Sequence, residues 1–430
     1  MEKISPKTKE LEPIPGLKLF LLRMPVQGVV SIKGSILGGE VFSPNDNPIL
    51  ALTVADMLDE GTRSHSKNVI REKLESVGAS ISFSSGQNRV GFSSKCLTLD
   101  TALVIRLIAE QLREPAFKDS EFEIFKKIAI GSLEQQREET GSLVRTAIRR
   151  KVFSDVHPNY AFDIDESINF LRKTTTADLR TFHDKNYGLG EAVMVVVGDF
   201  DEKKIVKEVE KSFGDWHQSG LPRSMDFTPI STRKPEHQFI TIKDKENTDL
   251  AMGQALGINR DHPDFDALSI GIRIFGGDFS SRLNTYVRGK LGLTYGIRTL
   301  VNGTAGGYDG FFAIRGIFAP TLLGRGIQES RKIFETWTKD GVTEEELDEK
   351  KKTISGEYIV GLETTGSLSG GICAVAERGK PISYLDEYPE IIKKITLEEV
   401  NSAIKKYIDS EKMITVAAGS IDSQGKPLED

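Results

Sequence analysis

Residues 276–283 read Gly-Gly-Asp-Phe-Ser-Ser-Arg-Leu, and residues 287–295 read Val-Arg-Gly-Lys-Leu-Gly-Leu-Thr-Tyr. Two polar donors, Arg288 and Tyr295, stand seven residues apart in this stretch, with two glycines between them. Gly276-Gly277 is not followed by the Gly-Lys-Ser/Thr ending of a phosphate-binding loop. We therefore expect these two glycines to serve a turn or a close packing contact.

The same pattern occurs earlier in the chain. Arg288-Gly289-Lys290-Leu291 matches Arg71-Glu72-Lys73-Leu74 at an offset of 217 residues. Thr-Leu-Glu-Glu-Val at 396–400 matches Thr-Thr-Ala-Asp-Leu at 175–179 at an offset of 221. A nearly fixed offset, with elements in the same order, predicts two copies of one domain.

The two predicted copies are separated by residues 216–237, which contain Gly, Pro, Ser and Thr and little apolar periodicity. We interpret this stretch as a linker between an N-terminal domain, 1–215, and a C-terminal domain, 238–430. Each copy mixes hairpins with runs of helices, which predicts an α+β fold. The expected architecture is two tandem homologous domains, each a mainly antiparallel β-sheet packed with helices, related by an approximate two-fold axis.

Hydrophobic periodicity and turn residues predict the elements of the first copy. Strands are expected at 17–23, 28–37, 79–85, 89–96 and 192–197. Helices are expected at about 49–59, 66–77, 98–113, 119–138, 142–153, 175–186 and 202–213. In the second copy, the Glu/Lys spacing on the helix around 344–352 predicts a solvated face.

Composition narrows the class of protein. The 430 residues hold 57 Lys and Arg against 63 Asp and Glu, a net charge of −6, which argues against a nucleic-acid binder. No run approaches 18 consecutive apolar residues, so no membrane span is predicted. Two distant cysteines, Cys96 and Cys373, exclude a disulfide framework and a Cys-based zinc site. The compartment stays open between the bacterial periplasm, if a signal peptide was trimmed, and the cytoplasm.

The order of elements and several short motifs resemble the insulinase-like metallopeptidases, a family that includes pitrilysin and the subunits of mitochondrial processing peptidase. The resemblance extends from about residue 16 to residue 419. It rests on the motifs at 55–62, 112–117, 157–160, 195–199 and 276–295. It implies the two-domain α+β fold and a connection to zinc-dependent proteolysis.

An active member of this family carries H-x-x-E-H on one helix, where two His bind zinc and the Glu is the general base. Aligned on Met57-Leu58 and Gly61-Thr62, these positions fall on Leu52, Ala55 and Asp56. The distal Glu ligand of the family falls on Ser132 or Gly131, and Glu134 lies close by in the sequence. Only Asp56 among these residues could ligate a metal, so we expect no metal site in this chain.

A replacement zinc site would have to be assembled from residues scattered along the sequence, which we do not expect. No two histidines lie within one helical turn of each other; they are His65, His157, His183, His217, His237 and His262. Asp56, Asp59 and Glu60 form an acidic cluster, interpreted as a solvated helix end, with a weak cation site as the alternative. We expect His157 to be a turn residue that contacts backbone or water.

The resemblance implies a role for Arg288 and Tyr295. In the family, an Arg and a Tyr at this spacing donate hydrogen bonds to the substrate carbonyl and help hold the developing oxyanion. A peptide carbonyl that becomes an oxyanion needs such preorganised donors. The alternative is structural: Arg288 as a surface helix residue and Tyr295 as a half-buried aromatic residue of a strand.

Half of a catalytic apparatus is therefore predicted and half is missing. This favours a non-catalytic subunit that is inactive alone and closes the chamber of a heterodimeric peptidase. Its partner would be a homologous subunit with an intact H-x-x-E-H that supplies the zinc, while this chain binds extended peptide at a sheet edge. The rival interpretation is a structural or peptide-binding homologue with no proteolytic role. A homodimer, the partner's identity and the substrate sequence are left open.

Overall fold

The computed structural model describes residues 3–25, 28–222 and 235–429. By its internal contacts the chain divides into two compact units, each assembled from three segments. The first unit comprises Met1–Ile130, Ile168–Met225 and Gly356–Pro389. The second comprises Gly131–Ser167, Asp226–Ser355 and Glu390–Asp430. Each unit thus takes segments from both predicted copies, so the boundaries predicted from the sequence repeat are not those of the spatial units. Within the predicted linker, residues 223–234 lie outside the described residues.

The sheet of the first unit has six strands in the order β1-β2-β6-β3-β5-β4. These strands are β1 (Thr8–Ile14), β2 (Leu17–Arg23), β3 (Val29–Leu37), β4 (Ser80–Ser85), β5 (Arg89–Leu97) and β6 (Ala192–Gly198). Neighbouring strands are antiparallel except for β2 and β6, which are parallel. The five strands predicted for this copy are present, and β1 is additional.

The sheet of the second unit has the order β7-β11-β8-β10-β9. Its strands are β7 (His237–Thr241), β8 (Thr248–Ala255), β9 (Gly296–Asn302), β10 (Phe311–Phe318) and β11 (Ile414–Gly419). Only β7 and β11 are parallel. Without β1, the first sheet has the same order and the same directions, which supports the predicted duplication and confirms the mainly antiparallel α+β fold.

Both faces of the first sheet are covered by helices. One face packs against α1 (Leu50–Asp56), α3 (Thr101–Arg113), α7 (Thr176–Asn186) and α8 (Glu202–Phe213), with α2 (Lys67–Glu75) beside them. The other face packs against α12 (Thr365–Glu377). Successive side chains of a strand point to opposite faces, so Leu19 and Leu21 lie in the first core and Phe20 and Leu22 in the second.

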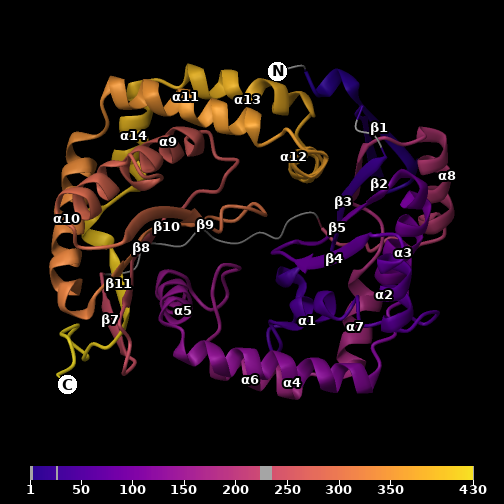
Figure 1. Cartoon of the computed structure of the whole chain (residues 1–430), viewed down its shortest axis with the longest axis horizontal. Helices are drawn as coiled ribbons and strands as arrows, with labels where there is room; N and C mark the ends of the chain where they lie inside the picture. Colours follow the sequence, from indigo (N-terminus) through magenta and orange to yellow (C-terminus); the bar gives the residue numbers. More distant parts are fainter. Residues whose placement is uncertain (1–2, 26–27, 223–234, 430) are drawn as a thin grey trace. The chain divides into compact units, whose positions relative to one another are not determined.

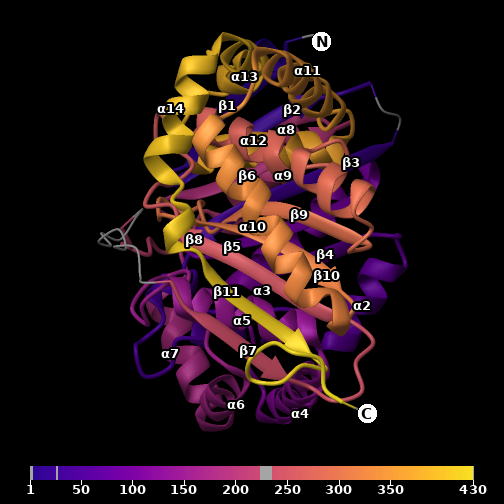
Figure 2. The same cartoon turned by 90° about the vertical axis from the view of Figure 1, so that its left-hand side faces the viewer.

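The second sheet is covered in the same way. One face carries α9 (Phe265–Gly276), α10 (Leu323–Asp340) and α14 (Leu397–Tyr407), and α10 crosses the strands in Figure 2. Here the ring of Phe312 stacks on the rings of Phe334 and Trp337, which are tilted relative to each other. The other face packs against α5 (Thr140–Val152) (Figure 1). The helix that covers each sheet on this side therefore comes from the other half of the sequence.

The remaining helices are α4 (Asp119–Gln135), α6 (Ile164–Lys173), α11 (Glu344–Val360) and α13 (Ser383–Lys394). Four of the five passages of the chain between the two units fall within these helices, and the fifth, between residues 225 and 226, lies outside the described residues. No single helix of the described residues is long and apolar enough for a membrane span, although α11 and α12, bent by 111°, pass that test as a pair.

Candidate functional site

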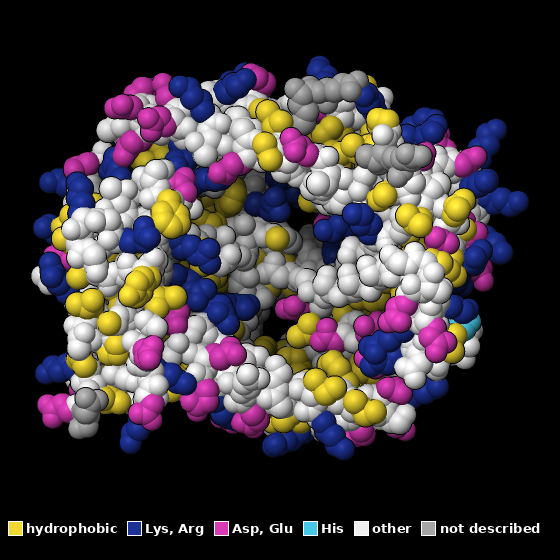
Figure 3. All heavy atoms as spheres, in the orientation of Figure 1, with side chains coloured by type: hydrophobic (Ala, Val, Ile, Leu, Met, Phe, Trp, Pro, Cys, Tyr) yellow, Lys and Arg dark blue, Asp and Glu magenta, His cyan; other side chains and the backbone are white. Residues whose placement is uncertain are grey.

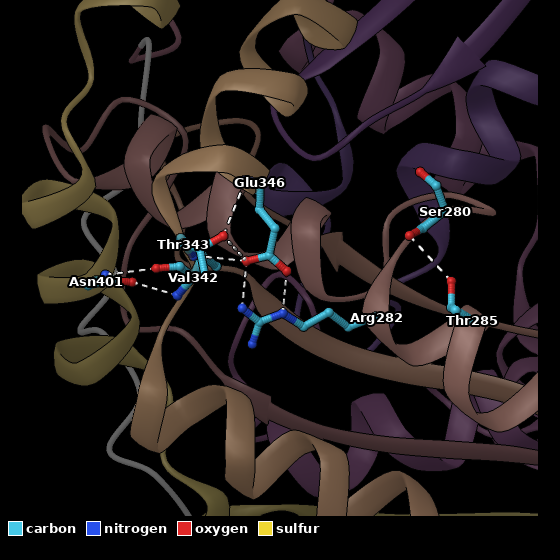
Figure 4. A network of polar contacts seen from close by, with 7 residues as sticks. All are labelled: Ser280, Arg282, Thr285, Val342, Thr343, Glu346 and Asn401. Atoms are coloured by element: carbon cyan, nitrogen blue, oxygen red, sulfur yellow. Dashed lines mark hydrogen bonds and ion pairs between the residues drawn. The ribbon is translucent and has the colours of Figure 1, made fainter. Parts of the chain in front are cut away.

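The glycine-rich stretch of the second unit begins where α9 ends against the sheet. A Cβ atom on Gly276 would lie 2.5 Å from Thr299 Cγ2 of β9, so only glycine allows this approach. The following loop is tied to α11 by two ion pairs. Arg282 donates from Nε and Nη2 to the two carboxylate oxygens of Glu346, both at 2.5 Å (Figure 4). A bidentate pair of this kind fixes orientation as well as distance.

Glu346 also closes the start of α11. It accepts a hydrogen bond from the backbone N–H of Thr343 at 2.8 Å. The side-chain amide of Asn401 on α14 accepts from the backbone N–H of Val342 and donates to its carbonyl oxygen (Figure 4). Burial opposes ionisation of Glu346, but its bond with Arg282 lowers the pKa below the usual value. The loop, α11 and α14 are thus held as one polar network.

The second ion pair joins Asp278 to Lys350. Lys350 is only 7% exposed, so the prediction of a solvated face is wrong for this residue of the helix. Asp278 also accepts from the hydroxyl of Ser280 at 2.9 Å. Burial opposes ionisation of Asp278, yet these two partners hold its pKa below the usual value. The sequence could not single out Lys350 among the charged residues of this helix, because its partner Asp278 lies far away along the chain.

After this anchored loop the chain forms a π-helix, η5 (Asn284–Lys290), that carries Arg288. Asn284 and Val287 are buried while Arg288 is exposed. The turn ends at Gly292, whose φ of +62° suits glycine and reverses the chain toward β9. π-Helices are rare and frequently lie at functional sites.

The structure brings Arg288 and Tyr295 together. The Nε of Arg288 donates to the backbone carbonyl of Tyr295 at 2.9 Å. The guanidinium carbon lies 4.7 Å from the ring centroid of Phe279, a cation–π distance. Four of the five guanidinium N–H donors have no hydrogen-bond acceptor within the described part of the chain.

The Tyr295 side chain is 91% exposed, so it is not the half-buried strand residue of the structural alternative. Its hydroxyl has no hydrogen-bond partner among the described residues. A hydroxyl without a partner can donate to a carbonyl oxygen or to an oxyanion, and so can the remaining N–H groups of the Arg288 guanidinium.

The four degenerate positions of the zinc motif lie on two helices. Leu52, 40% exposed, and Asp56, also exposed, stand four residues apart on α1 and therefore share one face. Ala55 is 2% exposed and faces the core. Ser132 lies exposed on α4. Helix α1 keeps the spacing of the motif but carries neither histidine nor the general base.

Asp56 is the one residue of this set that could ligate a metal. The surrounding protein removes water from its carboxyl group, and the negative charge of Asp59 lies nearby. Together these effects raise the pKa of Asp56 to about 6, although part of the residue is exposed to solvent. Glu60 is engaged by Lys67, and Glu134 pairs with Arg137 at 2.5 Å. Among the described residues, no group of three or more His, Cys, Asp or Glu side chains could hold a metal ion.

His157 lies in a turn and contacts the backbone, as predicted, but it also has a side-chain partner that the prediction did not include. Its Nδ1 accepts from the backbone N–H of Asn159 at 3.0 Å, so Nε2 donates to Asp309 at 2.8 Å. Both side chains are buried, which makes the pair a structural bond of the second unit. Asp309 is too far along the chain for local sequence to have indicated it.

Two family profiles match this chain. Residues 22–159 match "Insulinase (Peptidase family M16)" and residues 173–354 match "Peptidase M16 inactive domain". The chain belongs to the M16 insulinase family. The resemblance drawn from the sequence motifs is thereby confirmed.

M16 relatives cover nearly the whole chain at low identity. An uncharacterized zinc protease of Streptomyces coelicolor is 20% identical over 95% of this chain and 90% of its own. The non-peptidase homolog YmxG of Helicobacter pylori is 24% identical over 86% of this chain and 84% of its own. These two relatives, one with and one without a peptidase name, therefore both match at less than 25% identity.

Solved structures show the same fold. A peptidase M16 inactive domain from Pseudomonas fluorescens superposes with a TM-score of 0.86 at 24% identity, covering 98% of this chain and 100% of the other. A protease from Helicobacter pylori gives a TM-score of 0.83 at 16% identity, covering 96% and 99%. The M16 fold of this chain is thus shared along its length.

Proposed function

We propose that this M16 chain is the non-catalytic subunit of a heterodimeric zinc peptidase. It closes the chamber of the pair, binds extended peptide, and presents Arg288 and Tyr295 to the substrate carbonyl. The zinc, the two histidines and the general base belong to a homologous partner with an intact H-x-x-E-H.

The observation that carries this proposal is the contrast between two sites. Arg288 is fixed by a hydrogen bond and a stacked ring and keeps free donors, as an oxyanion-binding group requires. On α1, Leu52 and Ala55 occupy positions that would need a ligand and a base. Selection for a chain that acts only with a partner would leave this combination.

Extended peptide has suitable places to bind in either unit. Strands β4 and β9 are each the last strand of a sheet, and their outer edges pair with no other described strand. An added peptide strand gains main-chain hydrogen bonds there, and alternate side chains give specificity. The Arg288–Tyr295 segment leads directly into β9.

The test is reconstitution with a homologue from the same organism that carries H-x-x-E-H, sought first among the neighbouring genes. Cleavage of a quenched-fluorescence peptide is measured at equal heterodimer concentration. Tyr295→Phe removes one oxyanion donor and is expected to lower turnover by about 100- to 1,000-fold, with Arg288→Ala comparable. Zinc content and heterodimer formation should not change. Unchanged turnover for both variants would contradict the proposed function.

The alternative is a peptide-binding or structural homologue without a proteolytic role. It is favoured by one comparison, the similarity to a protein named a non-peptidase homolog. Co-purification of the native complex with metal analysis separates the two. A zinc-containing homologue in the complex supports the peptidase subunit, and its absence supports the alternative.

A further inference from the structure

Two arginines face each other in the sheet of the second unit. Arg298 of β9 and Arg315 of β10 are direct cross-strand partners. Side chains at such positions stand about 4.5–5.5 Å apart at Cβ, and like charges there destabilise a sheet. A natural sequence that keeps such a pair retains a cost to folding, which points to a role in binding.

A third arginine adds to the pair. On α5, which packs on the same face, Arg145 Nη1 and Asp249 Oδ1 would lie 3.5 Å and 3.3 Å from a Cβ on Gly141. The Asp249 carboxylate is engaged by the hydroxyl of Thr140 at 2.7 Å. Dark blue side chains gather over β10 and the adjoining part of α5 in Figure 3.

The three guanidinium groups have no hydrogen-bonded acceptor within the described residues. Burial, then the charges of Arg145 and Arg298, lower the pKa of Arg315 from its usual value, as expected where cations crowd. Three positive charges against the single carboxylate of Asp249 leave this arginine cluster with a net charge of +2. A local positive charge of this size attracts anions.

We propose that Arg145, Arg298 and Arg315 bind acidic side chains of an extended peptide that adds to the free edge of β9. The proposal rests on the proposed function and names its substrate class. Arginine forks match carboxylate geometry and can hold it with two hydrogen bonds.

The strand itself favours a peptide as the source of the anion. Ile297 and Thr299 of β9 are buried on the face that carries α9, α10 and α14, and Arg298 between them is exposed on the face that carries α5. A residue of an added strand that lies opposite Arg298 would project onto the same face. Acidic residues at every second position would then lie on the arginine side, while neighbours in sequence would not.

Spacing therefore provides a sharp test, because charge alone cannot reproduce it. The full chain is titrated into four fluorescein-labelled ten-residue peptides, followed by anisotropy. The first has glutamates at every second position between valine and threonine. The second has the same composition with its glutamates contiguous, and the third and fourth carry glutamine and lysine in their place. The first should bind at least about tenfold tighter than the others, and salt should weaken it.

A double variant replaces the arginine pair by serines, the residue type of the cross-strand pair Ser82 and Ser93 in the first sheet. Arg298→Ser with Arg315→Ser should abolish the preference for alternating glutamate. It should also raise the midpoint of thermal unfolding by about 1–3 °C, because the like charges are removed. Arg325→Ser with Lys352→Ser removes the same charge from exposed positions of α10 and α11 and should alter neither. A midpoint lowered by the first variant would show a structural pair and overturn the proposal.

The remaining outcomes are equally decisive. Equal binding of all four peptides would overturn the arginine site while leaving peptide binding, and the role of Arg288 and Tyr295, intact. Binding of no peptide would overturn both the site and the peptide-binding part of the proposed function. A ten-residue oligothymidylate that binds as tightly as the alternating peptide, and is lost with the same two substitutions, would assign the site to nucleic acid instead.

Discussion

In the first unit, Ser82 of β4 faces Ser93 of β5 and their hydroxyls hydrogen-bond at 2.8 Å; in the second, Arg298 of β9 faces Arg315 of β10. Each pair joins the outermost strand of its sheet to the strand beside it. The next strand inward contributes Lys33 to one row and Ala251 to the other. The two serines bond to each other without charge. The two arginines instead place like charges side by side, and we propose that an anionic group from outside the chain balances them.

A second contrast lies in the helix that follows the first α-helix of each copy of the sequence repeat. In the first unit it is α2, a regular α-helix that Ser66 caps by accepting from the N–H of Val69. In the second it is the π-helix η5, which carries Arg288. The same topology therefore supports a regular connection in one unit and an irregular, externally anchored one in the other. Departures from local regularity mark the unit that we propose contacts substrate.

The largest expected effect on the contrast between α2 and η5 comes from removing the ion pair between Lys350 and Asp278, which holds the loop before η5. Lys350→Ala leaves the Asp278 carboxylate without its cation and should lower the free energy of unfolding by about 2–3 kcal/mol. Denaturant titration measures this. Lys352→Ala, the same change at an exposed position of α11, should stay within about 0.5 kcal/mol. Equal effects of the two substitutions would mean that the ion pair does not hold the loop.

The next prediction concerns Asp56 of the first unit, whose ionisation should make the stability of the protein depend on pH. An acid whose pKa rises from 3.8 to about 6 on folding holds its proton more tightly in the folded state. Its contribution to stability is therefore most favourable below about pH 4 and declines as the pH rises to about 6. Asp56→Asn should stabilise the protein above pH 6, by no more than about 1 kcal/mol because the side chain is exposed, and should have no effect near pH 4.

Unfolding midpoints measured from pH 4 to pH 8 test this prediction. Asp348→Asn, at an exposed position of α11, serves as the control for loss of a carboxylate. A stabilisation by Asp56→Asn that does not depend on pH would contradict the assignment to ionisation.

The smallest expected effect comes from rebuilding the zinc motif. Leu52→His, Ala55→Glu and Asp56→His together should give no measurable peptide hydrolysis by the chain alone. The distal glutamate is still missing at Ser132, and a glutamate at the buried position 55 lacks partners for its charge. Peptide cleavage and zinc content of the purified variant are the measurements. Clear hydrolysis would show that another residue supplies the distal ligand.

Local patterns were sufficient where the structure depends on neighbours in sequence. Strands β2 to β6 and the helices of the first copy follow the predicted ranges within a few residues. Helix α6 was missed although Ile164, Ile168 and Leu171 give it an amphipathic spacing that could have revealed it. Strand β1 gave no signal because four of its seven residues in a row are exposed, so buried and exposed positions do not alternate.

The sequence by itself determined the duplicated α+β fold, the family, the absence of the H-x-x-E-H residues and the candidate pair Arg288 and Tyr295. Each of these depends on the order of residues and on short spacings, which a chain displays before it folds. Only the tertiary structure decided that α5 and α12 each cover the sheet formed mainly by the other half. It also joined Lys350 to Asp278 and set Arg298 opposite Arg315, because strand register and long-range packing bring together residues whose local sequences carry no trace of one another.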